Sequence, residues 1–215
     1  MKKTALFGIS LIAVATLAQS ISVFAADTAP APETTTGKVT LMDDPNSTHP
    51  GGDGDGDGGD TGQKGPFTLD HTVDYDFGTQ MVTGKEMTLN ATQTKPYTQV
   101  TDLRENNSGW VLSTKITDFK TEDGTKTLKG AQMTMPAGTA EAVDASNTSA
   151  APTTSEVKLN ASDATLFTAA KDAGIGSWMD KMYDTPTTLY IPAGATPGAY
   201  SATITWTLTD APSGF

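Results

Sequence analysis

Residues 200–208 read YSATITWTL, and apolar and hydroxyl-bearing side chains alternate along this stretch. The even positions are Tyr200, Ala202, Ile204, Trp206 and Leu208, and the odd positions are Ser201, Thr203, Thr205 and Thr207. Side chains of a β-strand point alternately to opposite faces, so this pattern predicts a strand that buries one face and presents hydroxyls on the other. Trp, Ile and Thr are also residues that strands favour.

A second stretch, residues 109–116, carries a related pattern. Trp110, Leu112 and Ile116 share one parity along the predicted strand. The triplet Trp-x-Leu therefore occurs twice in the chain, each time with Trp and Leu on the same strand face.

Similar stretches along the rest of the chain predict an all-β fold. They cover residues 67–77, 87–91, 97–103, 128–135, 155–159 and 188–191. Short strands at a spacing of roughly ten residues, with turn residues between them, are typical of an antiparallel β-sandwich of the immunoglobulin-like or Greek-key type. We expect at most one short helix, at residues 161–173, with Asn160 or Ser162 as its cap. We also expect a long surface loop at residues 137–154, and a hairpin between residues 188–191 and 200–208.

The N-terminal part of the chain is not typical of a folded domain. Residues 1–25 combine two lysines, an apolar run and a small-residue cleavage site, which together predict a secretory signal peptide. Residues 26–65 are rich in Pro, Thr, Gly and Asp and predict a disordered acidic tether. The predicted β-sandwich domain then occupies residues 66–215.

The two Trp-x-Leu triplets carry a family resemblance. The second lies in Y-x-x-x-I-T-W-x-L and is followed by Asp210, Ala211 and Pro212. This constellation resembles the WxL domain family of Gram-positive cell-surface proteins. The resemblance implies an all-β domain that attaches its protein non-covalently to cell-wall peptidoglycan. It also implies a secreted protein at the cell-wall surface, in a complex with other surface proteins such as WxL-interacting and wall-anchored proteins.

The candidate wall-binding residues are the motif residues and the third tryptophan. They are Trp110, Leu112, Trp206, Leu208, Tyr200 and Trp178. Indole rings stack on sugars, but buried Trp also fills the space between two sheets. Parity favours a core position for Trp206 and, less strongly, for Trp110, whose place beside a turn leaves one exposed ring face as an alternative. Trp178 lies in a loop-like stretch, and core and surface positions are equally compatible with its sequence context.

The net charge and the absence of cysteine exclude several kinds of partner and of attachment. The net charge is −11 at pH 7 and cysteine is absent. Nucleic acids and anionic membranes require a basic surface, so we expect neither as a partner after signal cleavage. The absence of cysteine excludes disulfides, a lipoprotein anchor and a thiol nucleophile. Because the protein is itself negatively charged, its contact with an anionic wall must rest on stacking and hydrogen bonds, or on bridging cations.

The sequence predicts neither a metal site nor an enzyme. The run from Asp53 to Gly58 copies the start of an EF-hand loop, but Lys64 stands where the bidentate Glu is needed. We interpret this run as an acidic linker, and we expect no cofactor. His71 is expected in the core or at a sheet edge, and Asp70, Asp74 and Asp76 on the solvated face of the first strand. No hydrolase motif accompanies them.

Two classes of function follow from these observations. The first is a wall-binding module that serves as a docking component of a cell-surface complex. The second is an adhesive or structural protein whose domain binds host matrix or another secreted protein. Only a tether precedes the predicted domain, so no separate adhesive domain is expected there, and this favours the first class.

Overall fold

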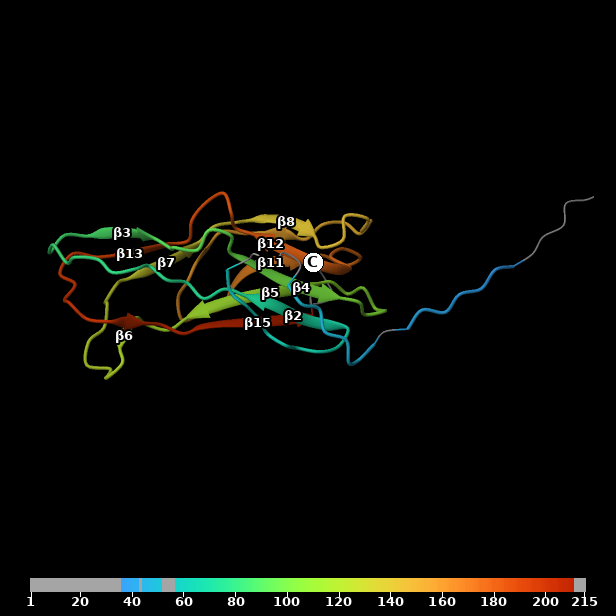
Figure 1. The fold of residues 1–215 in the computed structure, drawn as a ribbon, viewed down its shortest axis with the longest axis horizontal. Coiled ribbons are helices and arrows are strands. Elements are labelled where there is room, and N and C mark those ends of the chain that lie inside the picture. Colours follow the sequence, from blue (N-terminus) through green and yellow to red (C-terminus); the bar gives the residue numbers. More distant parts are fainter. Residues whose placement is uncertain (1–35, 43, 52–56, 211–215) are drawn as a thin grey trace, which may run out of the picture. The chain divides into compact units, whose positions relative to one another are not determined.

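The computed structural model describes residues 36–42, 44–51 and 57–210 (Figure 1). The predicted signal peptide, Asp53, Asp55 and residues 211–215 lie outside these ranges. The chain divides into two compact units, Met1–Thr40 and Leu41–Phe215. The described part of the first unit, residues 36–40, has no helix or strand, and the strands described below all belong to the second unit.

The first sheet has five antiparallel strands in the order β1-β2-β4-β12-β8. Its strands are β1 (Gly59–Asp60), β2 (Phe67–Thr72), β4 (Tyr97–Asp102), β12 (Gly176–Lys181) and β8 (Thr139–Ala142).

The second sheet, which we call the motif sheet, contains both Trp-x-Leu triplets. Its order is β15-β5-β11-β9, again antiparallel. The strands are β15 (Ile204–Asp210), β5 (Trp110–Ile116), β11 (Ala164–Ala169) and β9 (Thr153–Thr154). The two triplets lie on neighbouring strands, and Leu208 stands opposite Leu112.

Two smaller sheets complete the unit. The third has the order β10-β7-β13-β3, with strands β10 (Val157–Lys158), β7 (Gln132–Met135), β13 (Thr188–Ile191) and β3 (Met87–Asn90). The fourth pairs β14 (Tyr200–Ser201) with β6 (Lys120–Thr121).

Two apolar clusters lie between these sheets. One joins the five-stranded sheet to the motif sheet through Val100, Trp110 and Phe167. The other joins the third sheet to the end of the motif sheet through Met133, Leu166 and Leu189. The fold is therefore an antiparallel β-sandwich, as the sequence predicted. The described residues contain no helix, so none of their segments is a helical candidate for crossing a membrane.

Residues 161–173, the one stretch in which the sequence allowed a short helix, contain strand β11 instead. The Asn160 side chain does accept a hydrogen bond from the Ser162 amide, at 2.7 Å, but it closes a turn and no helix follows. Leu166 and Phe167 are both fully buried, and β11 pairs with β5 on one side and β9 on the other. Pairing on both edges and burial outweigh the weak helix preference of an Ala-containing segment.

Three further expectations differ from the structure. Residues 188–191 and 200–208 do not form a hairpin: β13 pairs with β3 and β7, whereas β14 and β15 pair with β6 and β5. The stretch 200–208 is divided between β14 and β15. Residues 137–154, expected to be a surface loop, contain β8 and β9.

The compact unit starts earlier than the predicted domain boundary at Pro66. Asp60 pairs with His71 across β1 and β2, and the Asp57 carboxylate accepts the Lys95 amide at 2.8 Å. Further along, the Gln99 side chain donates to the carbonyls of His49 and Pro50. Residues 44–51 and 57–65 thus cover the outer face of β2 and β4.

This cover buries Asp70, which the sequence placed in solvent. Asp70 is 3% exposed and accepts hydrogen bonds from Thr68, Gln99 and Thr101. His71 is also buried and stacks on Tyr97 at 4.0 Å, as expected for a core histidine. Buried and exposed residues do not alternate along β2, because both faces of this strand are covered.

Candidate functional site

The first motif tryptophan belongs to the core. Trp110 is fully buried, its indole N–H donates to the Gly174 carbonyl at 3.2 Å, and its ring meets Phe167 edge to face at 4.9 Å. Gly174 has a φ of 66°, and a Cβ there would lie 2.9 Å from the indole nitrogen. Only glycine fits this position. The interpretation of Trp110 as a core residue is confirmed.

The second candidate platform, Trp178, is also buried. It lies on strand β12 rather than in a loop, is 5% exposed and donates its indole N–H to the Ile175 carbonyl at 3.0 Å. Leu112 is fully buried as well. None of these three side chains presents a surface to a ligand.

The second motif is only half-buried. Trp206 faces inward as its parity predicted and contacts both apolar clusters, yet it stays partly exposed, like Leu208 beside it. Tyr200 is half-buried too, and its hydroxyl donates to the Thr196 carbonyl at 2.9 Å. The Trp-x-Leu triplets therefore join the sheets to the core, with the second triplet nearer the surface.

Arg104 clamps the ends of both motif strands, a role that sequence reasoning missed. Its guanidinium makes two 2.8 Å hydrogen bonds to Asp102, lies 3.5 Å over the Phe67 ring and pairs with Asp210 at the end of β15. It also donates to the Gly109 carbonyl at 3.1 Å. The available signal was an arginine in the turn before the first motif and an aspartate just after the second.

Hydroxyl side chains gather on the outer face of the motif sheet. The register aligns Thr207 with Ser113 and Thr165, and Thr209 with Val111, Thr168 and Thr153. We call this surface the threonine face, and its members are Ser113, Thr153, Thr165, Thr168, Thr205, Thr207 and Thr209. All seven are exposed or half-exposed. The face exists because the apolar partners of alternate parity point into the core.

The threonine face carries little charge. Lys115, its one lysine neighbour on β5, lies 3.4 Å from Asp163. Hydroxyls can both donate and accept hydrogen bonds, as sugar hydroxyls and amides do. The surface is thus suited to a polar, uncharged or locally neutral ligand rather than to an ionic one.

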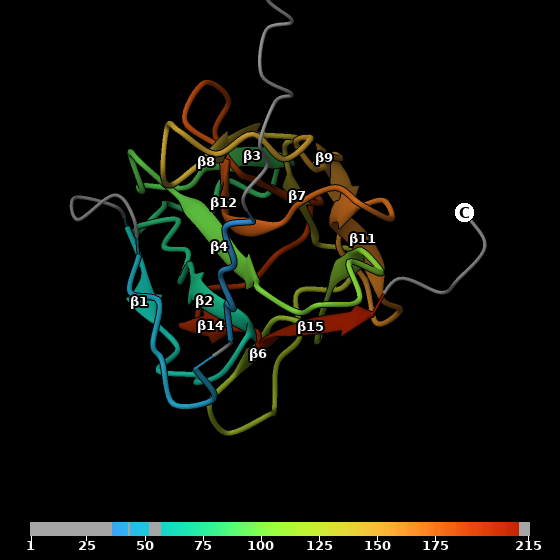
Figure 2. The same ribbon diagram turned by 90° about the vertical axis from the view of Figure 1, so that its right-hand side faces the viewer.

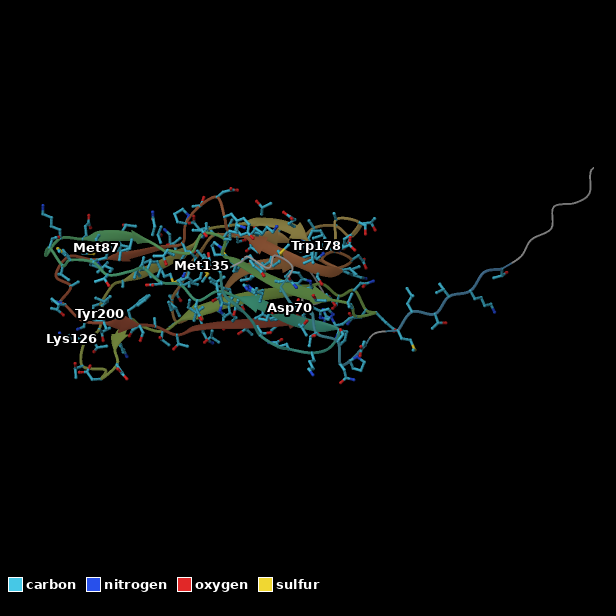
Figure 3. All side chains as sticks on the ribbon, in the orientation of Figure 1. Asp70, Met87, Lys126, Met135, Trp178 and Tyr200 are labelled. Atoms are coloured by element: carbon cyan, nitrogen blue, oxygen red, sulfur yellow. The ribbon has the colours of Figure 1, made fainter. Side chains whose placement is uncertain are left out.

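An apolar cavity of about 810 Å³ opens at the other end of the unit. It lies between the third sheet and the β14–β15 stretch, and its lining includes Tyr75, Phe77, Phe119, Leu189, Tyr200 and Ile204. Figure 3 shows Tyr200 and Met87 at this end, with Trp178 and Asp70 farther along the unit. Met81, which is 89% exposed, also lines the cavity.

The comparison with protein families agrees with this arrangement. A family model described as the WxL domain, surface cell wall-binding, matches residues 27–212. The chain belongs to the WxL family. No curated protein and no solved structure gives a significant match to the chain. The family is one of surface cell wall-binding domains, which agrees with the expected role of a wall-binding surface protein.

Two carboxylates, those of Asp70 and Asp180, lie buried within the WxL domain. Burial raises the pKa of Asp70, and hydrogen bonds from Thr101, Thr68 and Gln99 oppose this shift. Burial raises the pKa of Asp180 to about 7, against the smaller effect of the Gly138 amide. Neither residue lines the cavity. Burial raises the pKa of Tyr75, a lining residue, and the Asp180 carboxylate is a lesser cause of the raised pKa of that phenol.

The described part of the WxL domain holds no group of three or more His, Asp or Glu side chains arranged around a metal ion. Of the acidic run, Asp57 uses its carboxylate on the backbone amides of Thr94 and Lys95. Asp53 and Asp55 lie outside the described residues.

Proposed function

We propose that this WxL protein is secreted, attaches non-covalently to cell-wall peptidoglycan through its threonine face, and serves as a docking component of a surface complex. The observation that carries the attachment is the register of the motif sheet, which aligns hydroxyls from four strands on one outer face. Glycan chains present hydroxyls and amides at a regular spacing, and a sheet surface with several aligned hydroxyls can bond to more than one of them at once. The motif tryptophans support this face from beneath and do not stack on sugar.

Charge supports hydrogen bonding as the main contact. The chain has a net charge of −11, so long-range attraction does not draw it to an anionic wall. The threonine face is locally neutral, so contact between this face and an anionic wall costs little electrostatic energy. Each hydroxyl that bonds to the glycan contributes about 1 kcal/mol, and several such bonds acting together give usable affinity.

Sedimentation with purified peptidoglycan, stripped of teichoic polymers, tests the attachment site. The variant Thr165→Ala/Thr205→Ala/Thr209→Ala should bind about 100-fold more weakly, because three hydroxyls at about 1 kcal/mol each contribute about 3 kcal/mol. The matched control is Thr88→Ala/Thr139→Ala, which removes exposed threonines from β3 and β8. Equal binding by the two variants would refute the threonine face as the contact.

The apolar cavity supports the docking role. Most of its lining side chains are aliphatic, aromatic or methionine, with a smaller number of polar groups such as Asp76 and Gln80 among them. Apolar side chains of another surface protein, such as a WxL-interacting or wall-anchored protein, would fill it better than sugar would. Filling the cavity by Ala195→Phe should abolish capture of such a partner and leave peptidoglycan sedimentation unchanged. Retained capture would exclude the cavity as the docking site.

A further inference from the structure

Among the residues that the structure describes, the C-terminal motif stretch is paired along one edge only. From Ile204 to Asp210 it pairs with β5, and at Tyr200 and Ser201 it pairs with β6, which follows β5 in the chain. No other strand of the described ranges pairs with β14 or β15. Strand β15 therefore forms the border of the motif sheet (Figure 2).

The hydrogen bonds at the start of β15 identify which backbone groups face this open edge. The Thr117 amide donates to the Thr203 carbonyl at 3.0 Å, and the Thr203 amide donates to the Thr117 hydroxyl at 2.9 Å. The Ile116 amide points the other way, to the Asn160 carbonyl. Because bonded and non-bonded pairs alternate in an antiparallel ladder, the amides and carbonyls of Ile204, Trp206 and Leu208 point away from β5.

This open edge lacks the usual protection against pairing with another strand. Residues 200–209 contain no proline and no charged side chain. At the far end, Asp210 is held in its ion pair with Arg104. The side chains of Ile204, Trp206 and Leu208 are also only half-buried, so apolar surface remains at the same edge.

We propose that a second copy of this chain pairs with β15 along this edge, antiparallel and centred on Trp206. Residues 203–209 read TITWTLT, a polarity pattern that is the same in both directions about Trp206. In this register Ile204 stands opposite the partner's Leu208, and the two Trp206 residues stand opposite each other. Thr205 stands opposite the partner's Thr207. The outward-facing amides and carbonyls of the two strands then lie opposite each other, and apolar side chains stand opposite apolar ones. Thr–Thr and aromatic pairs are favourable across strands.

The absence of charge along the strand favours a second copy over a charged partner segment. No like charges meet across the pair, because the stretch from Tyr200 to Thr209 is uncharged. The net charge of −11 on each copy opposes approach at long range, and salt screens that repulsion. The dimer would join two motif sheets and their threonine faces into one continuous surface, which adds bivalent contact with a wall. The pairing itself does not depend on wall binding.

Analytical ultracentrifugation of the chain without the predicted signal peptide, residues 26–215, from low to physiological salt, tests the pairing. We expect a species of twice the monomer mass, whose share rises with protein concentration and with salt. The variant Thr205→Glu/Thr207→Glu sets carboxylates opposite each other and should be monomeric. The variant Thr205→Lys/Thr207→Glu sets opposite charges together in the proposed register and should remain dimeric. Both positions face the solvent side of the sheet, and circular dichroism verifies that each variant is folded.

The outcomes separate the possible occupants of the edge. A wild-type chain that stays monomeric at its highest soluble concentration would overturn the proposal and leave the edge to a strand of another protein. A dimer unaffected by Thr205→Glu/Thr207→Glu would show that the copies meet elsewhere. Loss of the dimer in Thr205→Lys/Thr207→Glu would overturn the register centred on Trp206. Because mass is measured without peptidoglycan, failure here is distinct from failure of the wall-binding proposal.

Discussion

Replacing Asp180 by Asn should stabilise the protein at neutral pH and flatten its pH dependence. Asp180 is fully buried on β12, opposite Thr98 on β4 and Ala140 on β8. In the part of the chain that the structure describes, no side chain donates a hydrogen bond to its carboxylate, and the Thr98 hydroxyl beside it is also without a partner. A charge at this position is poorly solvated, and burial accordingly raises the pKa of Asp180 from 3.8 to about 7.

The magnitude follows from the two pKa values. The difference between 3.8 and about 7 corresponds to about 4 kcal/mol of unfolding free energy. Since the folded state has the higher pKa, it retains a proton that the unfolded chain releases. The free energy of unfolding contributed by Asp180 is therefore fully present below pH 3.8, falls as pH rises and is lost above about pH 7. Burial also raises the pKa of Asp70, which leaves a residual slope of the same sign.

Urea denaturation followed by tryptophan fluorescence, between about pH 4 and pH 8, measures this effect. At pH 8 the Asp180→Asn variant should be more stable than the wild type by up to about 4 kcal/mol, and at pH 4 the two should be similar. The Asn amide can also donate to the Thr98 hydroxyl. Asp74→Asn is the control, because Asp74 is exposed. An Asp180→Asn variant that keeps the wild-type pH profile, or is less stable at pH 8, would refute the reasoning.

Three further predictions concern the core, the N-terminal segment and the wall. Trp110→Ala should cost about 3–5 kcal/mol and Trp206→Ala clearly less, because only the first ring is fully buried; equal losses in denaturant titrations would contradict this difference. A chain starting at Pro66 should melt at a lower temperature than one starting at Leu41, since residues 44–51 and 57–65 cover Asp70 and Tyr97. Identical midpoints would assign that cover no structural role. Wall sedimentation should hold or improve from low to physiological salt and improve as pH falls toward the pI of about 4.4, whereas collapse in modest salt would point to ion pairing through the lysines at 115, 120, 126 and 129.

The faces of the motif strands could be predicted from the sequence because the strand period is local. Residues 200–208 need only their own alternation to assign Thr205 outward and Trp206 inward, and the structure agrees. The partner of that strand could not be predicted in the same way. Pairing of Leu208 with Leu112 is long-range, and the local turn signal favoured a hairpin with residues 188–191 that does not form.

The remaining differences arise where tertiary contacts override local pattern. Asp70 alternates as a solvent-facing residue, and only the cover by residues 44–51 makes it a buried one. Asn160 carries a signal shared by helix caps and turns, and strand pairing of β11 decides between them. The threonine face could be assigned only from the register of four strands. The sequence alone could predict only those of its members that lie on β15.

Solution NMR of the isotope-labelled protein, titrated with soluble peptidoglycan fragments, tests the central claim most directly. If the threonine face binds the wall, the largest shift changes should fall on the amides and methyls of Thr165, Thr168, Thr205, Thr207 and Thr209. The exposed threonines outside the motif sheet, Thr88 on β3 and Thr139 on β8, should remain unchanged. Shift changes confined to the cavity lining around Phe77 and Leu189, or to Thr88 and Thr139, with no change on the motif sheet, would contradict the account.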